Sequence, residues 1–230
     1  MSKFKSLNFQ SIKNALVSFI FIFLLSLTAC AQPLKKSIPI LKTKQSAILA
    51  HAKWQATQDV TYDGSYRIID YPNGDVPANI GVCTDVVIRA YRAVDIDMQQ
   101  VIYEDVKDNL SYYYPIYFKR GTAKADPNID HRRVHIIRKF LNKNYPDSKI
   151  KNSEPYLPGD IIVWGNWHIG ILIDEKVEGT DRYYAVHNIG AGPQKEDVYY
   201  DEYDIDHYRW KPYEEVEVEE FENKLSKSEL

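Results

Sequence analysis

One cysteine and two histidines are the residues of this sequence that could form a nucleophilic site. Cys83 stands in GVCTDVVIRAYR, between a glycine-led loop and the start of a predicted helix. A cysteine nucleophile needs a base that takes its proton, a polar group that orients the base, and donors for the oxyanion. The N-terminus of a helix offers free N–H groups and a positive dipole end, and both favour a thiolate.

The spacing of the histidines supplies a base and an orienting group. His168 begins a predicted strand, HIGILID, and His187 ends the next one, YYAVHNI. If the strands form an antiparallel hairpin, the two histidines become cross-strand neighbours about 5 Å apart at Cβ. The loop EKVEGTD leaves the register open. Asn188 is the alternative orienting residue, because its side chain faces opposite to that of His187 and only one of the two can point at His168.

The N-terminal leader predicts export. Three lysines precede the apolar run ALVSFIFIFLLSL, which is short for a transmembrane helix and suits a signal peptide. The run ends in LTAC, which resembles the lipobox of bacterial lipoproteins. That resemblance implies a lipidated Cys30 and, with Ala31 after it, the periplasmic face of the outer membrane. A plain secretory signal, with a protein secreted into the periplasm, is the alternative.

Export makes an unpaired thiol significant. Thiols tend to pair in an oxidising compartment, and with Cys30 lipidated, Cys83 has no partner within the chain. An inert, buried Cys83 is the alternative. The mature chain carries 26 basic and 32 acidic residues, which does not favour binding to nucleic acid. About 200 residues suit one domain.

The periodicity predicts helices first and strands later. Helical spacing occurs at 46–60, from 84, from 97 and after Asp130, with Asp97 and Asp130 as N-caps. From LPGDIIVWG onward the period changes to that of strands, which indicates an α+β fold with N-terminal helices packed on a C-terminal antiparallel sheet. We expect a signal peptide at 1–29, a lipid-anchored tether at 30–45, a folded domain at 46–212 and a flexible acidic tail at 213–230. The tyrosines in SYYYPIY are expected at the edge of the core rather than in a groove.

The motifs resemble those of the papain-like, NlpC-type cell-wall peptidases and amidases. More closely, the chain resembles the bacterial family called domain of unknown function 1287 from about residue 47 to 211. The strings that carry this resemblance are YPNGDVPANIGVCTDVVIRAYR, DPNIDHRR, LPGDIIVW, HIGI and HNIGAG. The resemblance implies a papain-like fold and a Cys–His–His site formed by Cys83, His168 and His187, with Tyr62 as an oxyanion donor. The helical segment 97–150 separates Cys83 from His168 by more than is usual for NlpC-type enzymes, so the substrate groove is expected to differ.

Several residues keep more than one interpretation. Asp130, His131 and Arg132 either bind a substrate carboxylate or cap a helix, and Asn188 is a further candidate contact of the substrate. His131 and His135 stand four residues apart, as zinc ligands on one helical face would. No glutamate lies between them as in zinc peptidases, so we expect neither a metal nor a cofactor.

The sequence therefore predicts a monomeric, lipid-anchored cysteine hydrolase that cleaves an amide bond in peptidoglycan stem peptides or another peptide. Two alternatives stay open. One is a module of the same fold that binds peptidoglycan or a partner without cutting it, and the other is an acyltransferase with the same three residues.

Overall fold

The computed structural model describes residues 44–151, 153–198 and 204–212, all within one compact unit. The predicted signal peptide, the lipidation site Cys30, nearly all of the tether and the acidic tail lie outside the described residues. Among the described helices none has the length and apolar character needed to cross a membrane.

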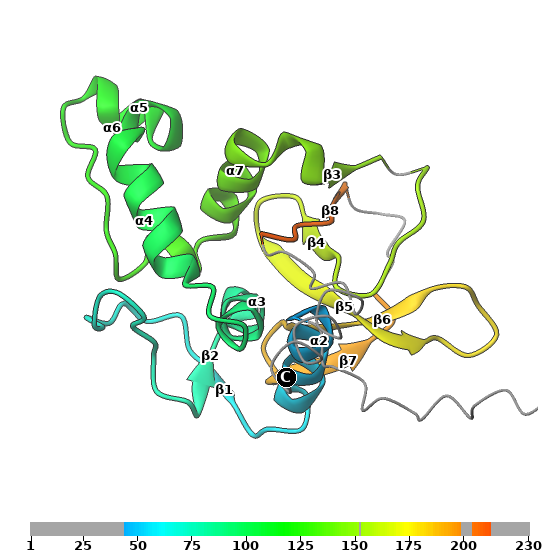
Figure 1. Cartoon of the computed structure of the whole chain (residues 1–230). Helices are drawn as coiled ribbons and strands as arrows, with labels where there is room; N and C mark the ends of the chain where they lie inside the picture. The colour runs from blue at the N-terminus through cyan, green and yellow to red at the C-terminus, as the bar shows by residue number, and fades with distance from the viewer. Residues whose placement is uncertain (1–43, 152, 199–203, 213–230) are drawn as a thin grey trace, which may run out of the picture. The chain divides into compact units, whose positions relative to one another are not determined.

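Helices fill most of the first two thirds of the domain (Figure 1). They are α2 (Lys44–Gln55), α3 (Cys83–Arg92), α4 (Met98–Asp108), α5 (Leu110–Tyr113), α6 (Pro115–Lys119) and α7 (Val134–Asn144), with 3₁₀ turns η1 (Asp130–Arg132) and η2 (Pro146–Ser148). Asp97 caps α4 as predicted, because its side chain accepts a 2.9 Å hydrogen bond from the N–H of Gln99. The expectation for Asp130 is wrong: it opens η1, and the N-cap of α7 is Arg133.

A six-stranded antiparallel sheet forms the last third. Its order is β3-β8-β4-β5-β6-β7. The strands are β3 (Lys149–Ile150), β4 (Ile161–Trp164), β5 (His168–Lys176), β6 (Tyr183–Asn188), β7 (Pro193–Glu196) and β8 (Ile205–Tyr208), and a separate parallel pair joins β1 (Thr61–Tyr62) to β2 (Ile80–Gly81). Helices followed by an antiparallel sheet confirm the α+β prediction.

Both faces of the central strands are buried, which explains their nearly continuous apolar runs. One face packs on α2 and α3 through residues such as Ile169, Ile171 and Val186. The other face carries a smaller cluster that includes Trp164 and Leu172. Side chains of a strand alternate between the faces, so His168 and Ile169 belong to opposite sides of β5.

The Pro-Gly-Asp turn holds the beginning of β4 to the end of the neighbouring strand β8. The Asp160 carboxylate accepts hydrogen bonds from the N–H of Leu157 and from Arg209, and it also contacts the buried ring of His207. Because β4 pairs directly with β5, this cluster fixes the hairpin that begins at His168. The aspartate of the motif is thus structural.

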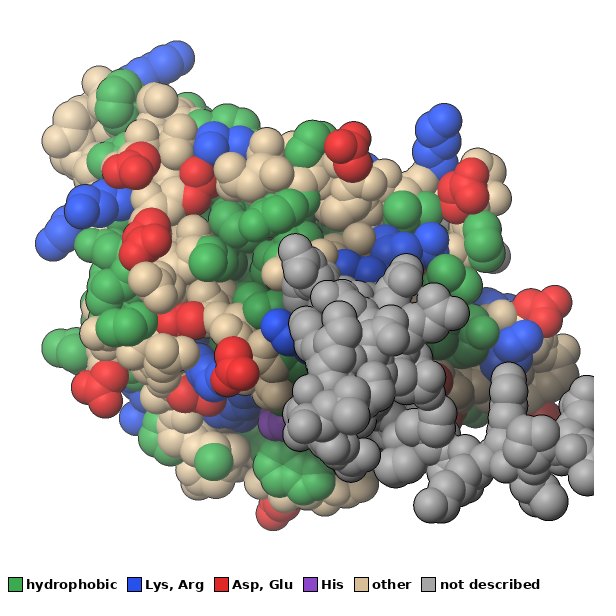
Figure 2. All heavy atoms as spheres, viewed as in Figure 1, with side chains coloured by type: hydrophobic (Ala, Val, Ile, Leu, Met, Phe, Trp, Pro, Cys, Tyr) green, Lys and Arg blue, Asp and Glu red, His purple; other side chains and the backbone are tan. Residues whose placement is uncertain are grey.

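The inserted segment 97–150 contains α4 to α7, drawn in green beside α3 in Figure 1. Acidic and basic side chains are interspersed on the face of the molecule seen in Figure 2. The stretch SYYYPIY contributes to α5 and α6, with Tyr113 buried and Tyr117 exposed.

Candidate active site

Cys83 is the first residue of α3, and the start of this helix is held by a buried ion pair. The Asp85 carboxylate accepts a 2.7 Å hydrogen bond from the N–H of Val82. It also receives two bonds from Arg132, of 2.9 Å from Nε and 2.8 Å from Nη2. Thr84 Oγ1 donates to the carbonyl of Arg132 at 3.1 Å. These contacts join η1 to α3 and fix the backbone on which the thiol stands.

The thiol borders a pocket of about 400 Å³, here called the thiol pocket. Its lining residues are Tyr62, Gly64, Val82, Cys83, Ile129, Arg132, Arg133, Val134, His135, Asn166 and Trp167. Cys83 is only 4% exposed and packs on its other side against the core between α3 and the sheet. A substrate can therefore approach the sulfur from one side only.

Burial sets the protonation of this thiol. It raises the pKa of Cys83 to about 11, and the negative charge of Asp85 acts in the same direction. The backbone N–H groups of Ile169 and Thr84 near the sulfur act to lower the pKa but do not prevail. The lowering of the pKa that the helix start favours is therefore outweighed by burial, and the thiol is neutral at pH 7.

The two strand histidines contact each other. His168 Nε2 lies 2.8 Å from His187 Nδ1. The register, which the sequence left open, places His187 opposite Gly170 rather than directly opposite His168. Gly170 makes room for this arrangement: a Cβ there would lie 3.0 Å from that of His187. The rings thus meet diagonally across β5 and β6.

Glu196 extends the histidine pair, and sequence reasoning missed it. Its Oε2 lies 2.9 Å from His187 Nε2, although the contact is not aligned as a hydrogen bond. Glu196 stands on β7, a short strand that was not predicted. The glycines in NIGAGP after β6 were the available signal, since a turn there returns the chain along β6 and brings Glu196 opposite Ala185.

Both imidazoles are neutral at pH 7. Burial, followed by the charge of His187, lowers the pKa of His168 to about 4. Burial also lowers the pKa of His187, while Glu196 acts to raise it. Two tryptophans surround His168: the ring of Trp167 stacks on it at 5.4 Å, and that of Trp164 lies at 5.0 Å.

Cys83 and His168 both lie near the start of β5, but on opposite faces of the sheet, and they do not bond. Cys83 packs with Ile169 on the α3 face, whereas the ring of His168 lies beside Trp164 on the other face. The sulfur lies near the backbone N–H of Ile169, the residue after His168. Within the described part of the chain, no hydrogen bond joins the sulfur to the imidazole. Trp167 borders both the thiol pocket and the small cavity beside His168 and His187, so the two parts of the site meet at this residue.

Two of the other predicted residues border the thiol pocket. Tyr62 lies on β1 with its side chain partly exposed. Burial and then the nearby Cys83 raise the pKa of its phenol, which is consistent with a neutral O–H donor beside the sulfur. Arg132 is the second, and its Nη1 is buried without a hydrogen-bond partner.

The remaining candidates are held in structural contacts, so their assignment to substrate is withdrawn. Asp130 is fully buried and accepts hydrogen bonds from the N–H of Asp126 and the hydroxyl of Tyr114. Asn188 is fully buried and donates to the carbonyl of Gly81 at 3.3 Å rather than to His168. His131 is a buried residue of η1 and borders none of the described pockets near the thiol.

The zinc alternative loses its geometric basis. His131 lies in η1 and His135 in α7, so the two do not share one face of one helix. In the described ranges, no three or more histidine, cysteine or acidic side chains gather closely enough to hold a metal ion.

Comparisons with known proteins place the chain in a family. A family model described as "Domain of unknown function (DUF1287)" matches residues 49–210, a range that contains Cys83, His168, His187 and Glu196. The "Uncharacterized protein YijF" of Escherichia coli (strain K12) is 40% identical over 172 residues, which cover 71% of this chain and 80% of the relative. No solved structure matches the chain. The chain belongs to the DUF1287 family.

Proposed function

We propose that this protein is a cysteine hydrolase of papain-like type that cleaves an amide bond in peptidoglycan stem peptides. The observation that carries the proposal is the position of a pocket-lining thiol at the start of α3, beside the strand end at which His168 contacts His187. A thiol, an imidazole and a group that orients the imidazole are the three parts that acyl transfer by cysteine requires.

The protonation states define the chemistry. As the Cys83 sulfur attacks the carbonyl carbon, its proton passes to Nδ1 of His168, and an S–C bond forms. Backbone N–H groups at the start of α3 and the hydroxyl of Tyr62 stabilise the oxyanion. His168 then returns the proton to the amine as the C–N bond breaks, which leaves a thioester. Water, deprotonated by His168, releases the acid and restores the thiol.

Because Cys83 and His168 are both neutral in the free protein, the proton passes from the thiol to the imidazole only after substrate has bound. Catalytic hydrogen bonds are often long in the free enzyme and tighten when substrate binds. In this proposal the side chain of His168, the first residue of β5, reaches the sulfur around the strand end when substrate binds. Substrate in the thiol pocket excludes water and brings the two groups together.

The location follows from the leader. A lipidated Cys30 would anchor the enzyme on the periplasmic face of the outer membrane, where stem peptides are within reach, and two acyl chains suffice for stable anchoring. A non-catalytic binding module is the second candidate. The raised pKa of Cys83 and the missing bond from its sulfur to His168, among the residues described, favour this alternative.

The test is product analysis with purified muropeptides. The wild type and the Cys83→Ala and His51→Ala variants are incubated with them, and products are read by mass spectrometry. His51 lies on α2 and controls for loss of a histidine outside the site. The proposal expects a mass gain of one water per cleaved amide with the wild type and His51→Ala, and none with Cys83→Ala. Binding without cleavage by the wild type would favour the binding module, and cleavage by Cys83→Ala would reject the nucleophile.

A further inference from the structure

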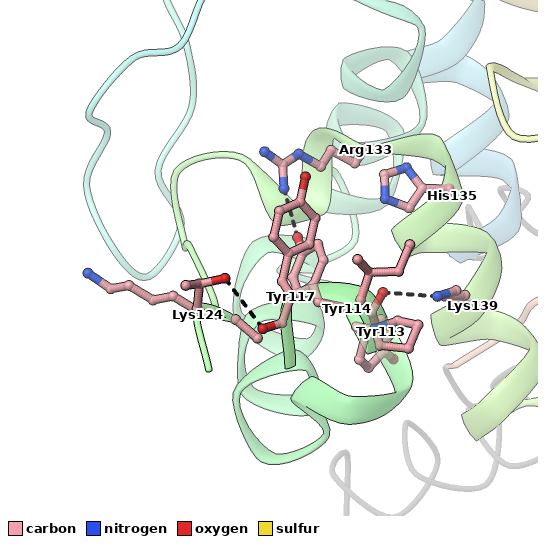
Figure 3. Close-up of a pocket in the computed structure, with 11 residues that line it drawn as sticks. Tyr113, Tyr114, Tyr117, Lys124, Arg133, His135 and Lys139 are labelled. Carbon is pink, nitrogen blue, oxygen red and sulfur yellow. Dashed lines mark hydrogen bonds between the residues drawn. The ribbon is translucent and has the colours of Figure 1, made fainter. Parts of the chain in front are cut away.

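The inserted helical segment forms a second cavity of about 560 Å³, here called the tyrosine pocket (Figure 3). Its lining residues are Tyr113, Tyr114, Pro115, Ile116, Tyr117, Thr122, Ala123, Lys124, Arg133, His135 and Lys139. Figure 3 shows tyrosine rings between Lys124 on one side and Lys139 on the other, with Arg133 and His135 at one end. All of these residues belong to α5, α6, α7 or the loops beside them.

The tyrosine pocket adjoins the thiol pocket. Arg133 and His135 line both cavities. A ligand that enters the thiol pocket beside Cys83 can therefore continue past these two residues into the tyrosine pocket. The segment that separates Cys83 from His168 in the sequence thus builds one end of a continuous binding surface.

The lining of this surface is cationic. Lys124, Arg133 and Lys139 border the tyrosine pocket, and none of the described residues that line either cavity is acidic. This contrasts with a chain whose formal net charge is −3. A cavity whose lining side chains carry only one sign of charge attracts groups of the opposite sign.

Part of this positive charge is not used within the protein. Lys124 makes no ion pair or hydrogen bond with any described residue, whereas Lys139 donates to the carbonyls of Tyr112 and Tyr113. Arg133 donates through Nη1 to the hydroxyl of Tyr114 at 2.7 Å and to the carboxylate of Asp130 at 3.4 Å, while its side chain stays 40% exposed. Two cations, Lys124 and Arg133, therefore remain accessible to a ligand.

A buried hydrogen-bond donor of Arg132 in the thiol pocket also favours an anionic ligand. The side chain of Arg132 is only 2% exposed, and its Nη1 has no hydrogen-bond partner. Buried guanidinium groups normally use all their donors, because an unsatisfied one costs free energy. A carboxylate is the ligand group that guanidinium matches best.

We propose that the tyrosine pocket is the subsite for a carboxylate-bearing arm of the peptide whose amide bond lies at Cys83. Lys124 and Arg133 pair with the carboxylate, and the rings of Tyr114 and Tyr117 cover the apolar part of the arm. The inference rests on the proposed function and deepens it, because it assigns the substrate an anionic segment beyond the bond that is cut.

The experiment measures binding by the full chain carrying Cys83→Ala, so that no ligand is consumed. The probes are a muropeptide with free carboxylates, the same muropeptide with its carboxylates amidated, and a linear acidic peptide of L-residues. Calorimetry gives the Kd of each probe for the parent and for added Lys124→Glu or Arg133→Gln. Lys119→Glu is the matched control, because it makes the same charge change on α6 and does not line the pocket.

The expected result is selective weakening. Lys124→Glu raises the Kd of the free muropeptide about fivefold, as expected for an accessible ion pair. Arg133→Gln raises it about tenfold, as expected for loss of a hydrogen bond to a charged group. Amidation of the ligand weakens binding similarly and abolishes both effects, Lys119→Glu changes the Kd less than about twofold, and salt weakens binding.

Equal affinity for the free and amidated muropeptides would overturn the inference, as would equal effects of Lys119→Glu and Lys124→Glu. Absence of saturable binding by all three probes would also overturn it. Equally tight binding of the acidic L-peptide would support the carboxylate subsite and assign it to protein substrates. Cleavage by the wild type is scored separately, so failure of the hydrolase proposal is distinguishable from failure of the subsite.

Discussion

His168 Nε2 lies 2.8 Å from His187 Nδ1, and this contact leaves Nδ1 as the nitrogen of His168 that the proposed mechanism uses. Glu196 Oε2 stands 2.9 Å from His187 Nε2 and favours a proton on that nitrogen. His187 Nδ1 is then an acceptor, and the proton between the two rings belongs to His168 Nε2. Nδ1 of His168 is left with a lone pair, as a general base requires.

The first prediction concerns this chain of contacts. We expect His187→Ala to lower kcat on a muropeptide about 100-fold, because the base loses the partner that fixes its tautomer and orientation. KM should change little, and His187→Asn should restore part of the rate because an amide oxygen can accept from Nε2. Steady-state kinetics provide the measurement. Unchanged kcat in His187→Ala would remove His187 from the account.

Glu196→Gln should have a much smaller effect. The side chain of Glu196 is 47% exposed, so water screens its interaction with His187. Pairs of this kind contribute up to about 1 kcal/mol, which corresponds to a loss of rate of about fivefold or less. A loss as large as that in His187→Ala would show that Glu196 acts in the reaction more directly than its exposure allows.

The second prediction concerns the thiol. Because burial raises the pKa of Cys83 to about 11, the free protein should react slowly with iodoacetamide at pH 7. The rate should rise through pH 10, since only the thiolate is nucleophilic. Peptide mapping after timed alkylation measures the rate at Cys83. A rate that is already maximal below pH 7 would indicate a thiolate stabilised in the free enzyme and contradict the neutral pair.

The third prediction is a loss of stability in acid. Burial lowers the pKa of both His131 and His168 from 6.5 to about 4. Between these values the unfolded chain binds protons that the folded chain does not, so stability is complete above pH 6.5 and falls as the pH decreases toward 4. Each histidine can contribute up to about 3 kcal/mol. Urea denaturation of the wild type and His131→Leu at several pH values measures this.

We expect His131→Leu to show a shallower decline of stability between pH 6.5 and 4 than the wild type. It should also keep its activity, because His131 does not border the thiol pocket. Parallel stability curves for the two proteins would mean that His131 does not titrate in this range. Loss of activity at full stability would return His131 to the substrate site.

The fourth prediction compares two ion pairs. Asp85→Asn leaves the Arg132 charge buried without its partner and should lower the free energy of unfolding by about 3–5 kcal/mol. Asp75→Asn, which removes the more exposed partner of Arg89 and Arg92, should cost about 1 kcal/mol or less. Chemical denaturation measures both. Equal decreases in the free energy of unfolding for Asp85→Asn and Asp75→Asn would show that breaking the buried Asp85–Arg132 pair costs no more than breaking an exposed one.

The sequence was sufficient for the elements with strong periodicity. The helix that follows Cys83, the helix after Asp97 and the strands that carry His168 and His187 occur where their patterns predict them. The helices have apolar residues at the helical period, and the strands have nearly continuous apolar runs; burial of these residues stabilises each element in the fold. Because the two strands could be recognised in the sequence, the contact between His168 and His187 could be predicted as well.

Tertiary contacts decided what the sequence could not. The diagonal meeting of His168 and His187 depends on the register with Gly170, which the loop between the strands left open. Glu196 lies on a strand of four residues, too short for a period to be recognised. Asp130 has the residue type of an N-cap, but its carboxylate accepts hydrogen bonds from the hydroxyl of Tyr114 and the N–H of Asp126. The pKa of Cys83 is raised because burial of the thiol outweighs the lowering effect of the backbone N–H groups at the start of α3.

The central claim is that Cys83 forms a covalent bond to the substrate acyl group. Its most direct test is intact-mass spectrometry and peptide mapping after a muropeptide reaction is quenched in acid within the first turnover. The account predicts an added acyl mass on Cys83 of the wild type, removable by hydroxylamine as a thioester is, and no adduct or cleavage in Cys83→Ala. Cleavage at the wild-type rate by Cys83→Ala, or a stable adduct on another residue, would contradict it.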